Sequence, residues 1–194
     1  DGGNVYYKEN EISKLNGKKL DEFRNQVQAI FQDPSASLNP NQTVEKILSE
    51  GIRYHKILES KNEIKSRVIE LLDNVNLDES YLERYPHQLS GGQKQRLCIA
   101  RAISLNPKLI ICDEAVSALD ISTQNTIIKL LNKLKKQLKL SYLFITHDLS
   151  VARLISDRIL VLKKGEIVEL STAEKIFKSP KNRYTKKLIS ALDF

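Results

Sequence analysis

The chain has 194 residues, of which 41% are hydrophobic and 28% are charged. This length is enough for one domain with a sizeable core, or for a core with a small lobe. No apolar run approaches about eighteen residues, which excludes a transmembrane helix, and no signal-peptide pattern is present, which favours the cytoplasm. The net charge of +7 permits a nucleic-acid partner, but the interleaved acids and bases are more typical of a solvated surface.

The first half of the chain predicts two short strands and then a helical lobe. Strands are expected at residues 3–7 and 27–31, and the second is followed by the loop "QDPSASLNP". From residue 43 to residue 82, apolar residues recur at helical spacing, and a further helix begins at Ser90. The predicted core positions of the lobe are Ile47, Leu48, Ile52, Ile64, Val68, Leu71 and Leu72.

The second half alternates between strands and helices. Strands are predicted within residues 108–114 and 141–148 and on both sides of the turn at Lys164 and Gly165; helices are predicted at 126–138 and 149–157. This alternation indicates a parallel α/β sheet. In such sheets ligands bind beyond the carboxyl ends of the strands. The polar residues at those ends are Asp113, Glu114, Thr146, His147 and Asp148.

Two cysteines, Cys98 and Cys112, lie singly in apolar segments. Their spacing matches neither a zinc site nor a disulfide framework, so we expect buried free thiols.

The run "LIICDE" places two acids after a buried strand. Asp113 is suited to hold Mg²⁺, which prefers oxygen ligands, and Glu114 to orient and deprotonate a water molecule. The alternative is a strand that simply ends in a solvated acidic turn.

The run "LSGGQ" combines a predicted helix cap with two glycines. Ser90 and Gln93 fit a capping box, which any helix could use. Gly91 and Gly92, however, each weaken a helix by about 1 kcal/mol relative to alanine. Close approach of a phosphate to the helix start would explain this cost.

Together with Gln32, which ends a strand, and His147, which follows another, these residues resemble the motifs of the ATP-binding subunit of ABC transporters. The motifs stand in the family's order: the Q-loop (Gln32), the signature (Ser90, Gly91, Gly92, Gln93), Walker B (Asp113, Glu114), the D-loop (Ser117, Asp120) and the H-loop (His147). Taken alone, Gln32 would not indicate any function, and a histidine placed like His147 would more often have a structural role.

The resemblance extends to the oligopeptide/dipeptide importer branch. It rests on "IFQDPSASLNP", "YPHQLSGGQKQR" and the tail "SPKNRYTKKLISAL". Ala115 departs from the family, which usually has proline there, and is expected to loosen the turn slightly. No G-x-x-x-x-G-K-[ST] run occurs, so the resemblance implies a P-loop NTPase-like (RecA-like) core with an inserted helical subdomain that lacks its N-terminal part. A chain truncated in this way should bind ATP poorly by itself.

The resemblance also implies roles. ATP and Mg²⁺ would lie between two ATPase subunits packed head to tail. Ser90, Gly91, Gly92 and Gln93 would contact ATP held by the partner. Glu114 would be the general base, Asp113 would support Mg²⁺, Gln32 would sense metal and water, and His147 would bind the γ-phosphate. Ser117 and Asp120 would join the two sites across the interface.

The implied regions are a remnant of the N-terminal core and antiparallel β region (1–31), a helical subdomain with the Q-loop (32–89), a RecA-like core (90–170) and a peptide-importer-type extension (171–194). The expected partners are a second ATPase subunit, membrane permease subunits at the cytoplasmic face and, indirectly, a solute-binding protein. No nucleic acid is expected. Two alternatives stay open: an ABC ATPase that acts on nucleic acid or ribosomes, and a non-catalytic chain that only donates its signature.

Overall fold

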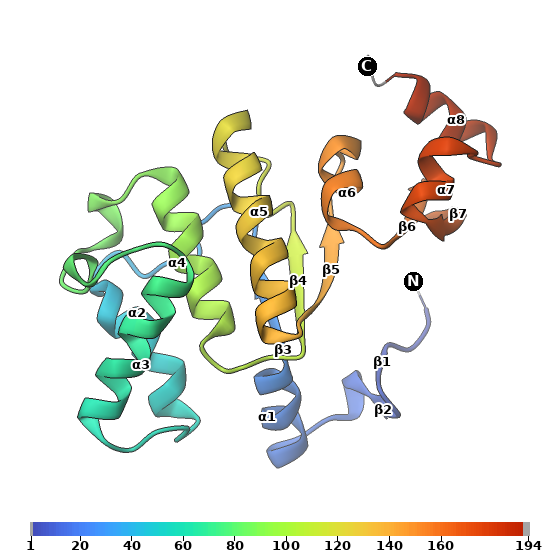
Figure 1. Ribbon diagram of the computed structural model, residues 1–194. Helices are drawn as coiled ribbons and strands as arrows, with labels where there is room; N and C mark the ends of the chain where they lie inside the picture. The colour runs from blue at the N-terminus through green and yellow to red at the C-terminus, as the bar shows by residue number, and fades with distance from the viewer. Residues whose placement is uncertain (1, 192–194) are drawn as a thin grey trace. The chain divides into compact units, whose positions relative to one another are not determined.

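The computed structural model describes residues 2–191 (Figure 1). The described chain divides into two compact units, one up to residue 143 and one from residue 144. The first unit contains the helical lobe, the signature and the Walker B run, and the second contains His147 and the C-terminal extension.

The first unit opens with a small antiparallel ribbon of β1 (Tyr6–Tyr7) and β2 (Asn10–Glu11), followed by η1 (Ile12–Lys14) and α1 (Gly17–Gln26). The strand expected at residues 3–7 is therefore shorter than predicted. Helix α1 was not predicted, because only Leu20 and Phe23 give it apolar periodicity and none of its residues is fully buried.

The helical lobe consists of α2 (Val44–Tyr54), α3 (Lys61–Asn74), η2 (Glu79–Tyr81) and η3 (Pro86–Gln88), and it leads into α4 (Gly91–Ile103). Helices α2 and α3 pack against each other and against α4. All seven predicted core positions are buried: Ile47, Leu48, Ile52, Ile64, Val68, Leu71 and Leu72. The helical periodicity of the sequence therefore identified the buried face of each helix.

The central sheet has the strand order β3-β4-β5, formed by β3 (Val27–Ile30), β4 (Leu109–Asp113) and β5 (Ser141–Ile145). Strands β3 and β4 are parallel, with Val27 opposite Leu109 and Ile30 opposite Cys112. Helix α5 (Ile121–Leu138) connects β4 to β5, and α4 packs against β3. The predicted parallel α/β core is confirmed.

The second unit contains α6 (Leu149–Ile155), β6 (Arg158–Lys163), β7 (Glu166–Thr172), α7 (Ala173–Lys178) and α8 (Arg183–Ser190). Strands β6 and β7 form an antiparallel hairpin. Its two turn residues, Lys164 and Gly165, both have positive φ, at 50° and 84°, as expected for a tight hairpin turn. Within residues 2–191, no helix has both the length and the apolar character needed to cross a membrane.

The extension is tied to the hairpin through Glu169 of β7. The Glu169 carboxylate accepts hydrogen bonds from the backbone N–H groups of Lys181, at 2.9 Å, and Asn182, at 3.1 Å. Both hydrogen bonds lower the pKa of Glu169, and the bond from Lys181 has the larger effect. Asn182 in turn caps α8 by accepting from the N–H of Tyr184 at 2.7 Å. One carboxylate therefore fixes where the last helix begins.

Candidate functional site

Glu114 follows β4 in a left-handed backbone conformation, with φ of 47°. Its carbonyl oxygen accepts hydrogen bonds from the N–H of Ser117 at 3.0 Å and from the Ser117 hydroxyl at 2.9 Å. Ala115 and Val116, inside this turn, are buried. A non-glycine residue in this region costs about 1–2 kcal/mol, and Glu114 shares it with turn and helix-end residues such as Lys139 and Lys164. The turn therefore fixes the backbone of Glu114 at the end of the strand.

Asp113 and Gln32 lie at the same edge of the sheet. Because β3 and β4 are parallel and Ile30 stands opposite Cys112, Gln32 leaves β3 at the edge where Asp113 ends β4. Both side chains are exposed. No group of three His, Cys, Asp or Glu side chains suited to a metal occurs in residues 2–191. Mg²⁺ usually keeps several waters and uses one or two carboxylates together with phosphate oxygens, so a site with a single carboxylate fits this ion.

The signature begins α4 with a complete capping box. The Ser90 hydroxyl accepts from the N–H of Gln93 at 3.3 Å, and Oε1 of Gln93 accepts from the N–H of Ser90 at 2.9 Å. This prediction is confirmed. In addition, Nε2 of Gln93 donates to the hydroxyl of Tyr81 at 2.8 Å. Both ends of the Gln93 amide are therefore engaged within the chain, whereas Ser90 and Gly91 are exposed at a helix start suited to an anion.

The two signature glycines have different surroundings. A Cβ atom on Gly91 would lie 3.7 Å from Cδ2 of Leu119, an ordinary contact, but one on Gly92 would lie 2.8 Å from Cγ2 of Thr123. The start of α4 thus lies directly against the start of α5. The sequence attributed both glycines to a phosphate; for Gly92 the structure adds an intramolecular reason that no local pattern revealed.

Asp120, the D-loop carboxylate, caps α5. Its Oδ1 accepts from the N–H of Thr123 at 3.0 Å and from the hydroxyl of Ser122 at 2.7 Å. Hydrogen bonds from the Thr123 side chain, the Ser122 hydroxyl and the Thr123 N–H hold the pKa of Asp120 well below its usual value. Asp120 is therefore a fixed, ionised helix cap within its own chain.

The segment after Gln32 is attached along one side of α4. Lys94 Nζ donates to Oγ of Ser35 at 3.1 Å, and the Cys98 thiol lies 3.8 Å from the carbonyl oxygen of Pro34. One turn further along α4, the Arg101 guanidinium donates to the carbonyl oxygen of Ser37. Positions 94, 98 and 101 lie on one helix face because they are four and three residues apart. No local sequence pattern predicts this attachment, because the partner loop is more than fifty residues away in the chain.

His147 belongs to the second unit, two residues beyond β5, and is exposed. The adjacent Asp148 caps α6 by accepting from the N–H groups of Ser150 and Val151 at 2.7 and 3.3 Å. The N–H of Asp148 donates to Oγ1 of Thr146 at 3.0 Å. The approach of His147 to the phosphate site of Glu114 stays a prediction.

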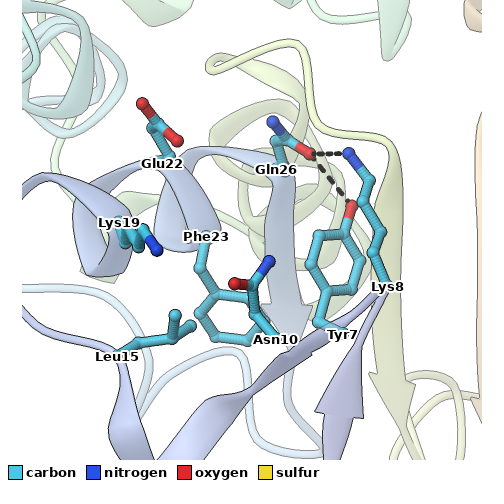
Figure 2. Close-up of a pocket in the computed structure, with 8 residues that line it drawn as sticks. All are labelled: Tyr7, Lys8, Asn10, Leu15, Lys19, Glu22, Phe23 and Gln26. Carbon is cyan, nitrogen blue, oxygen red and sulfur yellow. Dashed lines mark hydrogen bonds between the residues drawn. The ribbon is translucent and has the colours of Figure 1, made fainter.

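A separate hollow of about 130 Å³ lies between the β1–β2 ribbon and α1 (Figure 2). Gln26 Oε1 accepts there from the hydroxyl of Tyr7 at 3.1 Å and from Lys8 Nζ at 3.0 Å, while the Tyr7 and Phe23 rings meet edge to face. All of its lining residues fall between Tyr7 and Gln26, outside the motifs described above. Tyr7, Lys8 and Gln26 pair with one another in this hollow, and we do not assign it a role.

Comparison with known sequences agrees with the motif order. Residues 1–117 match the ABC transporter family. The oligopeptide transport ATP-binding protein OppF of Bacillus subtilis is 47% identical over 192 residues, which is 99% of this chain and 63% of that protein. The dipeptide transport ATP-binding protein DppF of Lactococcus lactis is 43% identical over 191 residues, 98% of this chain and 61% of that protein. The chain thus spans somewhat less than two thirds of the length of these relatives.

Solved structures agree with the fold. The dimeric post-hydrolysis state of the ATP-binding cassette MJ0796, bound to ADP and Pi, matches with a TM-score of 0.76 at 32% identity, covering 89% of this chain and 74% of that one. The cbiO1 structure from Clostridium perfringens, part of the ABC transporter complex cbiONQ, matches with a TM-score of 0.80 at 27% identity, covering 98% and 73%. With its family match, its motif order and this fold, the chain belongs to the ABC transporter family.

Proposed function

We propose that this chain is part of an ATP-hydrolysing subunit that drives an ABC importer of oligopeptides or dipeptides. The observation that carries the proposal is the turn after β4, which fixes Glu114 one residue beyond Asp113 at the carboxyl edge of a parallel sheet. The relatives that match almost the whole chain include oligopeptide and dipeptide transport ATP-binding proteins, and this supports the choice of solute.

The roles of the residues follow from their chemistry. Mg²⁺, when bound, neutralises charge on the phosphate oxygens of ATP. Asp113 would hold this ion, and the amide of Gln32 can contact both the ion and water. Glu114 would orient the attacking water and accept its proton. His147 would hydrogen-bond the γ-phosphate, and Ser117 would act indirectly by fixing the Glu114 turn.

A second ATPase subunit would complete each site. The exposed start of α4 at Ser90 and Gly91 is suited to the phosphates of ATP held by that partner, with Gly92 allowing close approach. Gln93 would act by holding this helix start in place, and Asp120 would lie near the junction of the two sites. The dimeric state of the MJ0796 cassette supports this pairing. The lobe of residues 32–89 would contact permease subunits at the cytoplasmic face of the membrane, and a solute-binding protein would deliver the peptide.

The decisive experiment uses the intact transporter that contains this sequence, reconstituted in vesicles. We expect ATP-dependent uptake of a labelled oligopeptide, and we expect Glu114→Gln to lower ATP turnover by about 10²–10⁴-fold, the usual size of a general-base contribution. The matched control is Glu166→Gln, which removes an exposed carboxylate from the β6–β7 hairpin.

Two results would contradict the proposal. Unchanged turnover in Glu114→Gln would favour the alternative in which the chain only donates its signature. ATP turnover stimulated by RNA or DNA but not by peptide import would favour an ATPase that acts on nucleic acid.

A further inference from the structure

The contact between Gly92 and Thr123 joins two motifs that are far apart in the sequence. Gly92 lies in the first turn of α4, beside the Ser90 cap, and Thr123 lies in the first turn of α5, beside the Asp120 cap. A Cβ atom on Gly92 would stand 2.8 Å from Cγ2 of Thr123, which is closer than real Cβ contacts come. A side chain at position 92 would therefore require the Thr123 side chain or one of the two helix starts to move.

Thr123 contacts both motifs with different atoms. Its methyl group faces Gly92, and its N–H donates to the Asp120 carboxylate at 3.0 Å. As a β-branched residue in a helix, threonine has only two favoured rotamers at χ1, so the methyl group can leave Gly92 only by a complete change of rotamer. One side chain thus sets the spacing between the start of the signature helix and the D-loop cap.

We infer that Thr123 is a positioning residue for the signature, and that its methyl group disfavours a side chain at position 92 independently of any phosphate that approaches there. The inference rests on the proposed function only where ATP turnover is measured; the packing contact stands on the geometry alone. Gly91 provides the internal comparison, because a Cβ atom there would meet Leu119 at an ordinary 3.7 Å.

The test is a double-mutant cycle in the complete chain. Gly92→Ala should lower the Tm by about 3 °C or more, whereas Gly91→Ala should raise it by up to about 2–4 °C, because alanine favours a helix over glycine by about 1 kcal/mol. Adding Thr123→Ala to Gly92→Ala should restore the Tm to at least that of Thr123→Ala alone, because alanine at position 92 then favours the helix. Adding Thr123→Val to Gly92→Ala should not restore the Tm, because valine keeps the methyl group. Alanine and valine both lack the hydroxyl, so any difference between them reports the methyl contact.

The same variants in the intact transporter supply a readout that stability alone does not move. ATP turnover is measured per folded molecule, well below the lowest Tm. Gly92→Ala should lower ATP turnover. Adding Thr123→Ala to the same chain should raise turnover again by about threefold or more, as expected for coupling between contacting residues. Thr123→Val should recover nothing.

Three outcomes would overturn the inference. The first is a Tm for Gly92→Ala no lower than that for Gly91→Ala. The second is equal rescue by alanine and valine at position 123. The third is recovery of the Tm without recovery of turnover, which would show that the phosphate itself requires the space at position 92. Absence of ATP hydrolysis in the unmutated transporter would instead refute the proposed function and leave the Tm cycle intact.

Discussion

The carbonyl oxygen of Glu114 accepts two hydrogen bonds from Ser117, one from the N–H at 3.0 Å and one from the hydroxyl at 2.9 Å. They close a turn in which Glu114 has φ of 47°. The carboxylate that we assign to catalysis therefore stands on a backbone conformation that glycine would adopt more easily.

We expect the chain with Glu114→Gly to be more stable than the chain with Glu114→Ala by about 1–2 kcal/mol, because glycine carries no penalty in the left-handed region. Both substitutions remove the same side-chain interactions, so their difference isolates the backbone term. Urea denaturation of the two variants measures it. Equal stability would show that this turn stores no strain.

The Ser90 cap should contribute measurably to the stability of α4. Ser90→Ala should cost about 1 kcal/mol, because it removes the acceptor for the N–H of Gln93, whereas Ser90→Gly should cost only a few tenths. Hydrogen exchange at the Gln93 amide, measured together with urea denaturation, locates the effect. If Ser90→Ala lowered the free energy of unfolding no more than Ser90→Gly did, the cap would not be stabilising.

Asp120 should make stability depend on pH in the acid range. Its pKa is lower in the folded chain than the unfolded value of about 3.9. The stabilisation from the ionised carboxylate is therefore fully present above the unfolded pKa and is lost as the pH falls through the folded pKa. Asparagine at position 120 keeps an acceptor at the cap but cannot ionise. The chain with Asp120→Asn should therefore lose less stability than the unmutated chain as the pH is lowered from 5.

Unfolding curves at a series of acid pH values test this prediction. Ser122→Ala removes one of the hydrogen bonds to the carboxylate and should give an intermediate pH dependence. Identical pH profiles for Asp120→Asn and the unmutated chain would show that folding does not lower the pKa of Asp120.

The two cysteines should resist alkylation in the folded chain. Burial raises the pKa of Cys98 to about 11 and that of Cys112 to about 12, and only the thiolate reacts. We expect iodoacetamide at pH 8 to modify both thiols at rates set by opening of the fold, and rapidly once urea has unfolded the chain. Rapid labelling of either thiol without urea, followed by mass spectrometry, would contradict their burial.

The sequence predicted the elements whose patterns are local. The apolar periodicity of α2, α3 and α5, the buried strand before Asp113 and the box formed by Ser90 and Gln93 each depend on residues a few positions apart. Helix α1 was missed, because its two apolar residues make too weak a period and tertiary context decides such short segments.

The sequence by itself determined the family, the order of the motifs and the kind of residue available to each step of the chemistry, because all of these are written in short contiguous runs. Only the tertiary structure decided what those residues contact. The left-handed turn at Glu114, the attachment of Ser35 and Ser37 to α4 and the approach of Thr123 to Gly92 all depend on how the chain folds back on itself. A helix start that looked like a simple anion site is also a close contact between two helices, and packing between distant segments leaves no local signature.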